Sequence, residues 1–127
     1  MKYLSPQQVL FIHARLITET GGASGLLDLA LIESAVACPR ASYAGEELYP
    51  GVFEKAAALL DSLVNNHPFV DGNKRAGITS AAMFLRINAV RLACSQEELE
   101  VFTMQVATTH PPIEMLANWM KEHSQSI

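Results

Sequence analysis

Residues 67–75 read His-Pro-Phe-Val-Asp-Gly-Asn-Lys-Arg, and no other part of the chain holds so many reactive side chains in so few positions. His67 can act as a general base, because imidazole exchanges protons readily near neutral pH. Asp71 offers a carboxylate, the ligand with which proteins hold magnesium beside phosphate groups. We therefore expect His67 to take a proton from an attacking hydroxyl and Asp71 to bind Mg²⁺.

The second half of this string predicts a site for phosphate. A helix that begins after Gly72 leaves its first backbone N–H groups unpaired and has the positive end of its dipole there. Asn73 adds an amide donor, and Lys74 and Arg75 add two cations, of which arginine can hold phosphate through two N–H groups at once. The predicted nucleotide-binding residues are thus Gly72, Asn73, Lys74 and Arg75, and the predicted catalytic residues are His67, Lys74 and Arg75.

Each part of the string also has an ordinary structural interpretation. A histidine before proline often only ends a helix, Asp-Gly-Asn is a common turn and capping sequence, and Lys-Arg can be a solvated face. A metal site built on His67 and Asp71 alone has no evident third ligand. The order of these residues between two apolar segments favours the functional interpretation. A base, a metal ligand and an anion site are what phosphoryl or nucleotidyl transfer requires, so the string indicates an ATP-dependent transferase.

The hydrophobic spacing around the string predicts an all-α fold. Ser5 and Pro6 suit the start of a first helix, which Gly21-Gly22 ends. The predicted helices cover residues 5–20, 28–38, 52–66, 73–87, 95–106 and 111–120, and only residues 90–93 look extended. We expect one compact domain over residues 1–127, with about six helices and the catalytic loop between the two central ones.

The bulk composition narrows the possible functions. Half of the 127 residues are hydrophobic, and the net charge of −4 argues against direct nucleic-acid binding, which requires a basic surface. Cys38 and Cys94 are isolated, as is usual in a reducing compartment. No apolar run approaches the roughly 18 residues of a membrane span, and the N-terminus lacks a signal-peptide pattern. We therefore expect a soluble cytoplasmic protein that does not enter membranes.

The string from His67 to Arg75 resembles the signature of the Fic/Doc family, His-Pro-Phe-x-(Asp/Glu)-Gly-Asn-(Gly/Lys)-Arg. In that family the signature lies on a loop between two helices of an all-α domain. The resemblance extends to the Ser-Pro opening, to the Gly-Gly end of the first helix and to the Phe-Leu-Arg-Ile-Asn sequence at 84–88. It implies that His67 is the base and Asp71 the magnesium ligand, with ATP as the nucleotide.

Two positions separate this chain from the AMP-transferring branch of the family. That branch carries glycine at the position of Lys74 and a second arginine at the position of Ile78. Both departures resemble the Doc (death-on-curing) branch, whose members are toxins of toxin-antitoxin pairs. The resemblance implies an ATP- and Mg²⁺-dependent protein Ser/Thr kinase that phosphorylates a threonine of elongation factor Tu and blocks translation. It also implies a Phd-like antitoxin as partner.

Two other functions remain open. The first is adenylyl transfer to a Ser, Thr or Tyr hydroxyl, because Pro68 and Gly72 are shared with that branch. The second is a catalytically inactive domain that acts by binding a partner. The self-inhibitory Ser/Thr-x-x-x-Glu-Gly/Asn segment of Fic enzymes has no match, so we expect inhibition to come from another chain. Segment 40–51 is either a flap that holds an extended target chain by strand pairing or an ordinary surface loop.

Overall fold

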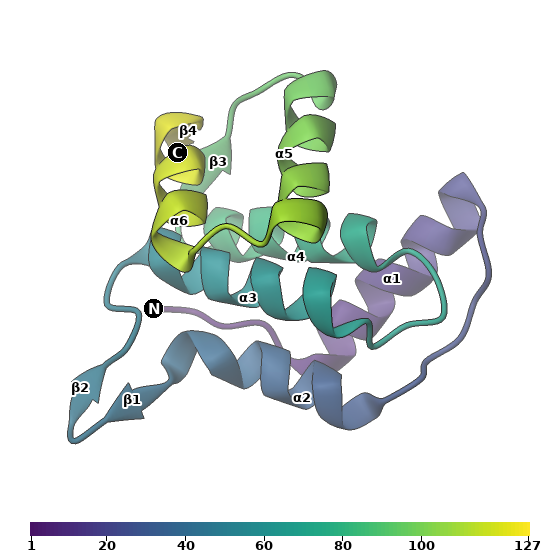
Figure 1. Ribbon diagram of the computed structural model, residues 1–127, viewed down its shortest axis with the longest axis horizontal. Helices are drawn as coiled ribbons and strands as arrows, with labels where there is room; N and C mark the ends of the chain where they lie inside the picture. The colour runs from purple at the N-terminus through teal and green to yellow at the C-terminus, as the bar shows by residue number, and fades with distance from the viewer.

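The computed structural model describes residues 1–127 as six α-helices and two small antiparallel β-ribbons (Figure 1). The helices are α1 (Pro6–Thr20), α2 (Leu29–Ala37), α3 (Val52–Asn66), α4 (Asn73–Ile87), α5 (Gln96–Thr109) and α6 (Ile113–Glu122). A short 3₁₀ turn, η1 (Cys38–Arg40), follows α2. The strands are β1 (Ser42–Tyr43), β2 (Glu46–Glu47), β3 (Val90–Leu92) and β4 (Ser124–Ser126). None of the helices is both long enough and apolar enough to cross a membrane.

Helix α3 lies at the centre of the molecule and contacts α2, α4, α5 and α6 (Figure 1). Its residues from Lys55 to Leu60 are all buried, which leaves little of its first half in contact with water. Leu63 and Val64 continue the buried face to the end of the helix and join one apolar cluster with residues of every other α-helix. The predicted all-α fold with two central helices around the loop is confirmed.

Helices α3 and α4 cross at a glycine. A Cβ atom built on Gly77 would lie 2.6 Å from Cγ2 of Val64, closer than two carbon atoms can approach. Val64 lies near the end of α3 and Gly77 one turn into α4, so this contact sets the spacing of the two helices just beyond the loop that joins them. The absence of a side chain at Gly77 therefore allows α3 and α4 to pack closely next to the loop that joins them.

Most helix ends follow the capping residues, but α5 and α6 end later than the sequence predicts, and α6 runs from Ile113 to Glu122 instead of from 111 to 120. Ser5 with Gln8 and Ser95 with Glu98 form the two capping boxes that the sequence predicts. The predicted end of the fifth helix at Val106 is wrong, because α5 continues to Thr109. His110 then adopts a left-handed conformation and ends the helix, and Pro111 follows it.

Extended structure is more frequent than the sequence predicts. The predicted segment at 90–93 is β3, and its partner β4 comes from the end of the chain. Segment 40–51 contains a hairpin in which Ser42 pairs with Glu47 and Tyr43 with Glu46. Ala44 and Gly45 have positive φ angles, as two-residue hairpin turns require.

The hairpin is fixed to the start of α3 by a buried lysine. Lys55 Nζ donates to the carbonyl oxygen of Pro39 and to Oε1 of Glu47, both at 2.9 Å. Figure 1 shows the hairpin and the loop after α3 at opposite ends of this helix. A helix of 15 residues is about 22 Å long, so a target chain paired with the hairpin would lie about that far from His67.

Candidate active site

The loop between α3 and α4 is bounded by two left-handed residues. His67 ends α3 with φ 50°, and Gly72 precedes α4 with φ 79°. Between them Phe69 is buried and attaches the loop to the core. The side chain of Asn73 closes the loop, since its Oδ1 accepts from the backbone N–H of Phe69 and its Nδ2 donates to the Phe69 carbonyl, both at 3.0 Å. The loop is thus shaped by one apolar contact and one amide clasp.

The predicted base, His67, is exposed at the end of α3. Its ring makes no hydrogen bond to another residue, so both ring nitrogens can reach a substrate. The left-handed conformation turns the chain sharply away from the helix axis, and Pro68 prevents the helix from continuing. This arrangement places an unoccupied imidazole at the entrance of the loop.

The predicted metal ligand, Asp71, is exposed and held by two backbone amides. Its Oδ1 accepts from the N–H of Gly72 at 2.8 Å, and its Oδ2 accepts from the N–H of Ala23 at 3.1 Å. The amides of Ala23 and Gly72, followed by the nearby charge of Arg75, hold the pKa of Asp71 below its ordinary value. Each oxygen keeps a free lone pair, so an ionised and oriented carboxylate is available to a hard cation such as Mg²⁺.

The start of α4 presents unpaired backbone donors, the arrangement that the predicted anion site requires. The backbone N–H groups of Asn73, Lys74 and Arg75 have no acceptor within the protein, because the first helical bond is donated by Ala76 to Gly72. Lys74 is exposed beside them. The Asn73 side chain uses its oxygen and one of its two N–H donors in the bonds to Phe69, so one side-chain N–H and the backbone N–H remain for the predicted nucleotide contact.

Arg75 points back to the end of α1. Its guanidinium donates to the Thr20 hydroxyl and, at 3.3 Å, to the carbonyl oxygen of Gly21. Gly22 lies against both charged groups, since a Cβ there would be 2.7 Å from Asp71 Oδ2 and 3.2 Å from Arg75 Nη2. The guanidinium has five N–H donors, so donors remain for a ligand.

The connection between α1 and α2 runs along the loop, a contact that is not among the sequence-based predictions. Leu27 N donates to the Pro68 carbonyl at 2.8 Å, and Val70 N donates to the Gly25 carbonyl at 3.1 Å. These bonds make an isolated antiparallel bridge between Leu26 and Phe69. The segment beside the loop is therefore 21–27, whereas segment 40–51 lies at the other end of α3 (Figure 1). Its glycines at 21, 22 and 25 were a usable signal, because each has a positive φ angle.

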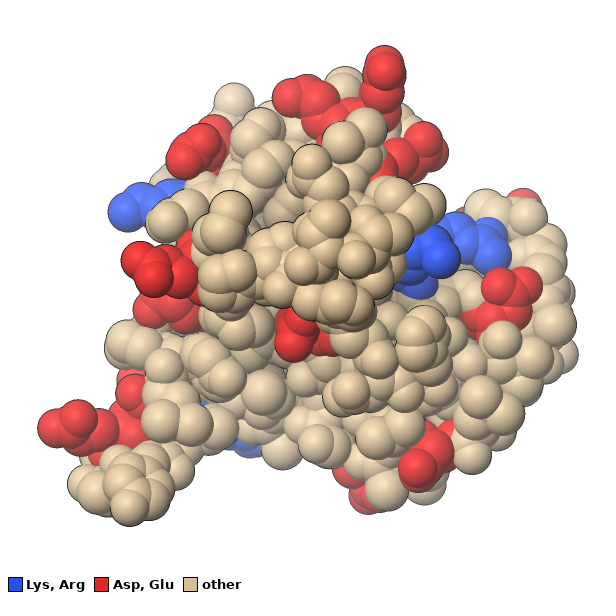
Figure 2. All heavy atoms as spheres, viewed as in Figure 1, with Lys and Arg blue, Asp and Glu red and all other residues tan.

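A groove of about 430 Å³ opens beside the cationic residues, between α4 and α5. Lys74, Arg75 and Ile78 line it from α4, and Leu99 and Met104 line it from α5. In Figure 2 a group of blue side chains lies beside the tan surface of the α5 region, near the place where Figure 1 shows the start of α4. Ile78 is 8% exposed and belongs to the core cluster, which confirms the predicted core role.

Comparison with known proteins identifies the family. The model of the Fic/DOC family matches residues 3–85, which include α1 to α3, the whole loop and all but the last two residues of α4. The chain belongs to the Fic/Doc family. The "Toxin Doc" of Mycolicibacterium smegmatis is 41% identical over 99 residues, 76% of each chain. The "Protein kinase doc" of Escherichia phage P1 is 31% identical over 121 residues, 95% of this chain and 94% of that protein.

The range of these matches matters for the groove. The family model ends at residue 85, so α5, which forms one wall of the groove, lies outside it. The phage P1 relative extends through most of the chain and therefore covers nearly all of the Fic/Doc domain seen here. The loop, the anion site and the groove thus belong to a chain that is similar to a Doc protein over almost its whole length.

Proposed function

We propose that this protein is a Doc-type toxin with protein Ser/Thr kinase activity. It transfers the γ-phosphate of ATP to a threonine of elongation factor Tu and so blocks translation in the cytoplasm. The observation that carries the proposal is the loop 67–75, which combines an unoccupied imidazole with an oriented carboxylate and three free N–H groups at a helix start. Relatives named "Toxin Doc" and "Protein kinase doc" support it.

His67 removes the proton from the acceptor hydroxyl. The hydroxyl oxygen then forms a bond to the γ-phosphorus, the bond from that phosphorus to the β,γ-bridging oxygen breaks, and ADP leaves. The backbone N–H groups of residues 73–75, with Lys74 and Arg75, hold the phosphate charge in a fixed position. Asp71 would hold Mg²⁺, which when bound supplies positive charge to the phosphates.

Lys74 and Ile78 favour γ-phosphate transfer over adenylyl transfer. A lysine beside the anion site fills space and adds charge where a glycine would let the nucleotide approach the backbone. Ile78 is an apolar core residue that also lines the groove, so the groove lacks a second arginine there to hold distal phosphates. Both features favour a nucleotide that offers its γ-phosphate to His67 and extends its nucleoside along the groove between α4 and α5.

Labelled ATP tests the reaction. The protein is incubated with elongation factor Tu, Mg²⁺ and ATP that carries the label at either the α- or the γ-phosphorus. We expect label on a threonine only with γ-labelled ATP, and no label when His67 is replaced by Asn. Transfer of the α-label would instead demonstrate adenylyl transfer. Absence of both transfer and calorimetric binding of Mg²⁺–ATP would favour a domain that acts by binding alone.

A Phd-like antitoxin is the proposed partner. The chain carries no match to the self-inhibitory segment of Fic enzymes, so control of a toxic kinase must come from another chain. Genes directly upstream of this one are the place to look for a small DNA-binding protein. Its coexpression should restore growth to cells that produce the kinase, and a complex should be recovered from them. Failure to restore growth would argue against this partner.

A further inference from the structure

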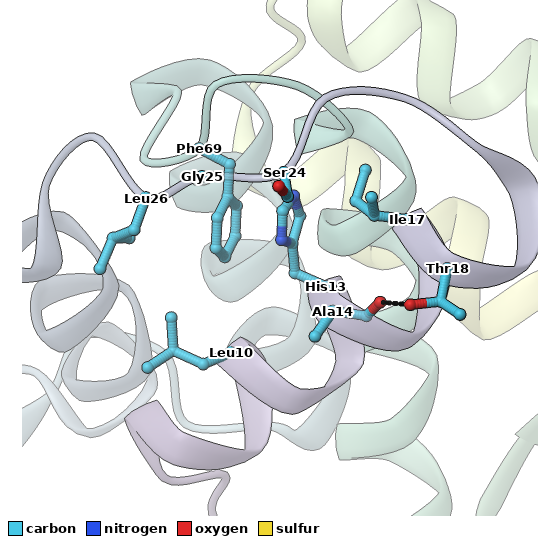
Figure 3. A pocket seen from close by; sticks show the side chains of 9 residues that line it. All are labelled: Leu10, His13, Ala14, Ile17, Thr18, Ser24, Gly25, Leu26 and Phe69. Atoms are coloured by element: carbon cyan, nitrogen blue, oxygen red, sulfur yellow. Dashed lines mark hydrogen bonds between the residues drawn. The ribbon is translucent and has the colours of Figure 1, made fainter.

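His13 is a buried polar residue to which the proposed reaction gives no role. Only 5% of it is exposed, and its ring stacks on Phe69 with centroids 3.6 Å apart and planes 2° apart (Figure 3). Its Nε2 lies 2.7 Å from the carbonyl oxygen of Asp71. A carbonyl can only accept, so this ring nitrogen carries the proton and donates it to the bond. The histidine of α1 is therefore bonded to the backbone of the residue that bears the loop's carboxylate.

The peptide unit between Asp71 and Gly72 is held at both of its ends. Its carbonyl oxygen accepts from His13, and its N–H donates to Oδ1 of Asp71 at 2.8 Å. The two bonds form a chain from the imidazole through the peptide to the carboxylate, and each bond polarises the next. The direction of the Asp71 carboxylate is thereby coupled to the orientation of this peptide plane.

His13 is the hydrogen-bond partner of the carbonyl oxygen of this peptide, and no backbone N–H bonds that oxygen. Gly72 has φ +79°, and glycine adopts positive and negative φ with similar ease, so the peptide can rotate where another residue would resist. Val70 and Asp71 are exposed, and their bonds to Gly25 and Ala23 do not involve the carbonyl oxygen of the Asp71–Gly72 peptide. The imidazole also lies against the glycine, since a Cβ on Gly72 would be 3.5 Å from Nε2. The contact with His13 selects one orientation.

We propose that His13 is a positioning residue for the catalytic loop. Its N–H donor fixes the Asp71–Gly72 peptide, and through it the carboxylate of Asp71 and the first turn of α4. The consequence for catalysis rests on the proposed function, whereas the effect on the loop is independent of the reaction. The ring stacking on Phe69 provides packing, and the donor provides the orientation.

Three substitutions separate the donor from the packing. His13→Gln places an amide N–H the same number of bonds from the backbone and keeps the donor. His13→Phe and His13→Leu fill the same buried position with an apolar side chain and remove the donor. Two such variants are used so that the test remains possible if one of them does not fold. His123→Phe is the matched control, because His123 also stacks on an aromatic ring, that of Trp119, and bonds a carbonyl at 2.7 Å, but lies at the end of α6.

Two measurements give the result. The first is hydrogen exchange of the Gly72 amide, which we expect to become at least about tenfold faster in the donor-free variants and to stay within about threefold of wild type in His13→Gln. The second is transfer of the γ-label, where we expect kcat to fall at least about tenfold in the donor-free variants and to be largely retained in His13→Gln. His123→Phe should change neither quantity.

The two readouts distinguish the possible failures. If the wild-type protein transfers no γ-phosphate, the proposed function fails, but the exchange of Gly72 still tests the positioning role. Unchanged Gly72 exchange in folded His13→Phe or His13→Leu would overturn the positioning role whatever the reaction is. A His13→Gln variant as defective as His13→Phe in both readouts would also overturn it, because the ring and not the donor would then matter.

Discussion

His67 and His110 end their helices with nearly the same backbone geometry, φ 50° and ψ 59° at His67 and φ 47° and ψ 59° at His110. Both side chains are exposed, and a proline follows each. The left-handed helix end is therefore a local property of the His-Pro sequence that this fold uses twice. What distinguishes His67 is its surroundings, since the chain after it carries the carboxylate of Asp71 and leads to the unpaired N–H groups at the start of α4.

This pair provides a matched test of the general base. Asparagine tolerates the left-handed conformation but cannot act as a base at neutral pH, so neither His67→Asn nor His110→Asn should lower the melting temperature by more than a few degrees. We expect His67→Asn to reduce γ-label transfer at least about 100-fold and His110→Asn to leave it unchanged. A His67→Asn protein with more than about a tenth of the wild-type rate would rule out His67 as the base.

The low pKa of Asp71 predicts a pH dependence of stability. Its carboxylate is stabilised in the folded state by the amides of Ala23 and Gly72, so its folded pKa lies below the unfolded value of about 3.9. The contribution of this group is therefore complete above pH 5 and is lost as the pH falls through the folded pKa. We expect the melting temperature to fall more steeply in the wild type than in Asp71→Asn as the pH is lowered from about 5 through the folded pKa. Parallel melting curves for the two proteins would contradict this.

Two neighbouring glycines allow the α1–α2 connection to be tested. Gly21 and Gly22 both have positive φ angles, so alanine at either position introduces backbone strain of about 1–3 kcal/mol. A Cβ on Gly21 meets nothing within 4 Å, whereas one on Gly22 would be 2.7 Å from Asp71 Oδ2. We expect Gly22→Ala, but not Gly21→Ala, to lower γ-label transfer at least about tenfold. Equal transfer rates in the two variants would show that the connection does not control the site.

The crossing of α3 and α4 should not tolerate a methyl group. Gly77→Ala places a Cβ 2.6 Å from Cγ2 of Val64, and overpacking of this kind costs about 1–3 kcal/mol of unfolding free energy. Urea denaturation measures the loss. The control is the same substitution in a Val64→Ala protein, where the clashing methyl group is absent and the added cost of Gly77→Ala should largely disappear. If the losses of unfolding free energy from Gly77→Ala and Val64→Ala simply add, the strain of Gly77→Ala does not come from the contact with Val64.

The buried lysine should hold the hairpin. Lys55→Met removes two hydrogen bonds from a charged donor and leaves the Pro39 carbonyl without a partner, a loss of about 2–3 kcal/mol. Glu47→Gln keeps an acceptor at a half-exposed position and should cost under about 1 kcal/mol. In Lys55→Met the amide of Leu48, which donates to Ala41, should also exchange faster. Unchanged exchange of the Leu48 amide in Lys55→Met would show that the lysine does not hold the hairpin.

The helices and the loop could be predicted from the sequence because their signals are local. Ser5, Ser95 and Asp28 cap the helices that follow them, and the glycine pair after Thr20 ends α1. Strand β4 could not be predicted, since Ser-Gln-Ser has neither apolar alternation nor branched residues, and it is extended only because β3 lies beside it. The extra turn of α5 is supported by the hydroxyls of Thr108 and Thr109, which donate to carbonyl oxygens four residues earlier.

Within the site, the residue types were predictable but their partners were not. The sequence predicts Asn73 as a phosphate donor, and the structure shows that its side chain also closes the loop on Phe69. Arg75 was predicted to face phosphate, and it also bonds the end of α1. The glycines of segment 21–27 indicate an irregular connection, but its contacts with residues more than 40 positions away follow from no periodicity or cap in the sequence.

The hydrogen bonds that orient the site join distant parts of the chain. Asp71 is bonded to Ala23 and His13, 48 and 58 positions away, and Arg75 to Thr20, 55 positions away. Helices α3 and α4 with their short loop can form through local contacts, but the carboxylate and the guanidinium are directed only when α1 docks onto them. The side chains of the loop therefore reach their final orientation late in folding. In a variant in which the docking of α1 is weakened, we expect γ-label transfer to be lost at a lower temperature than helical structure.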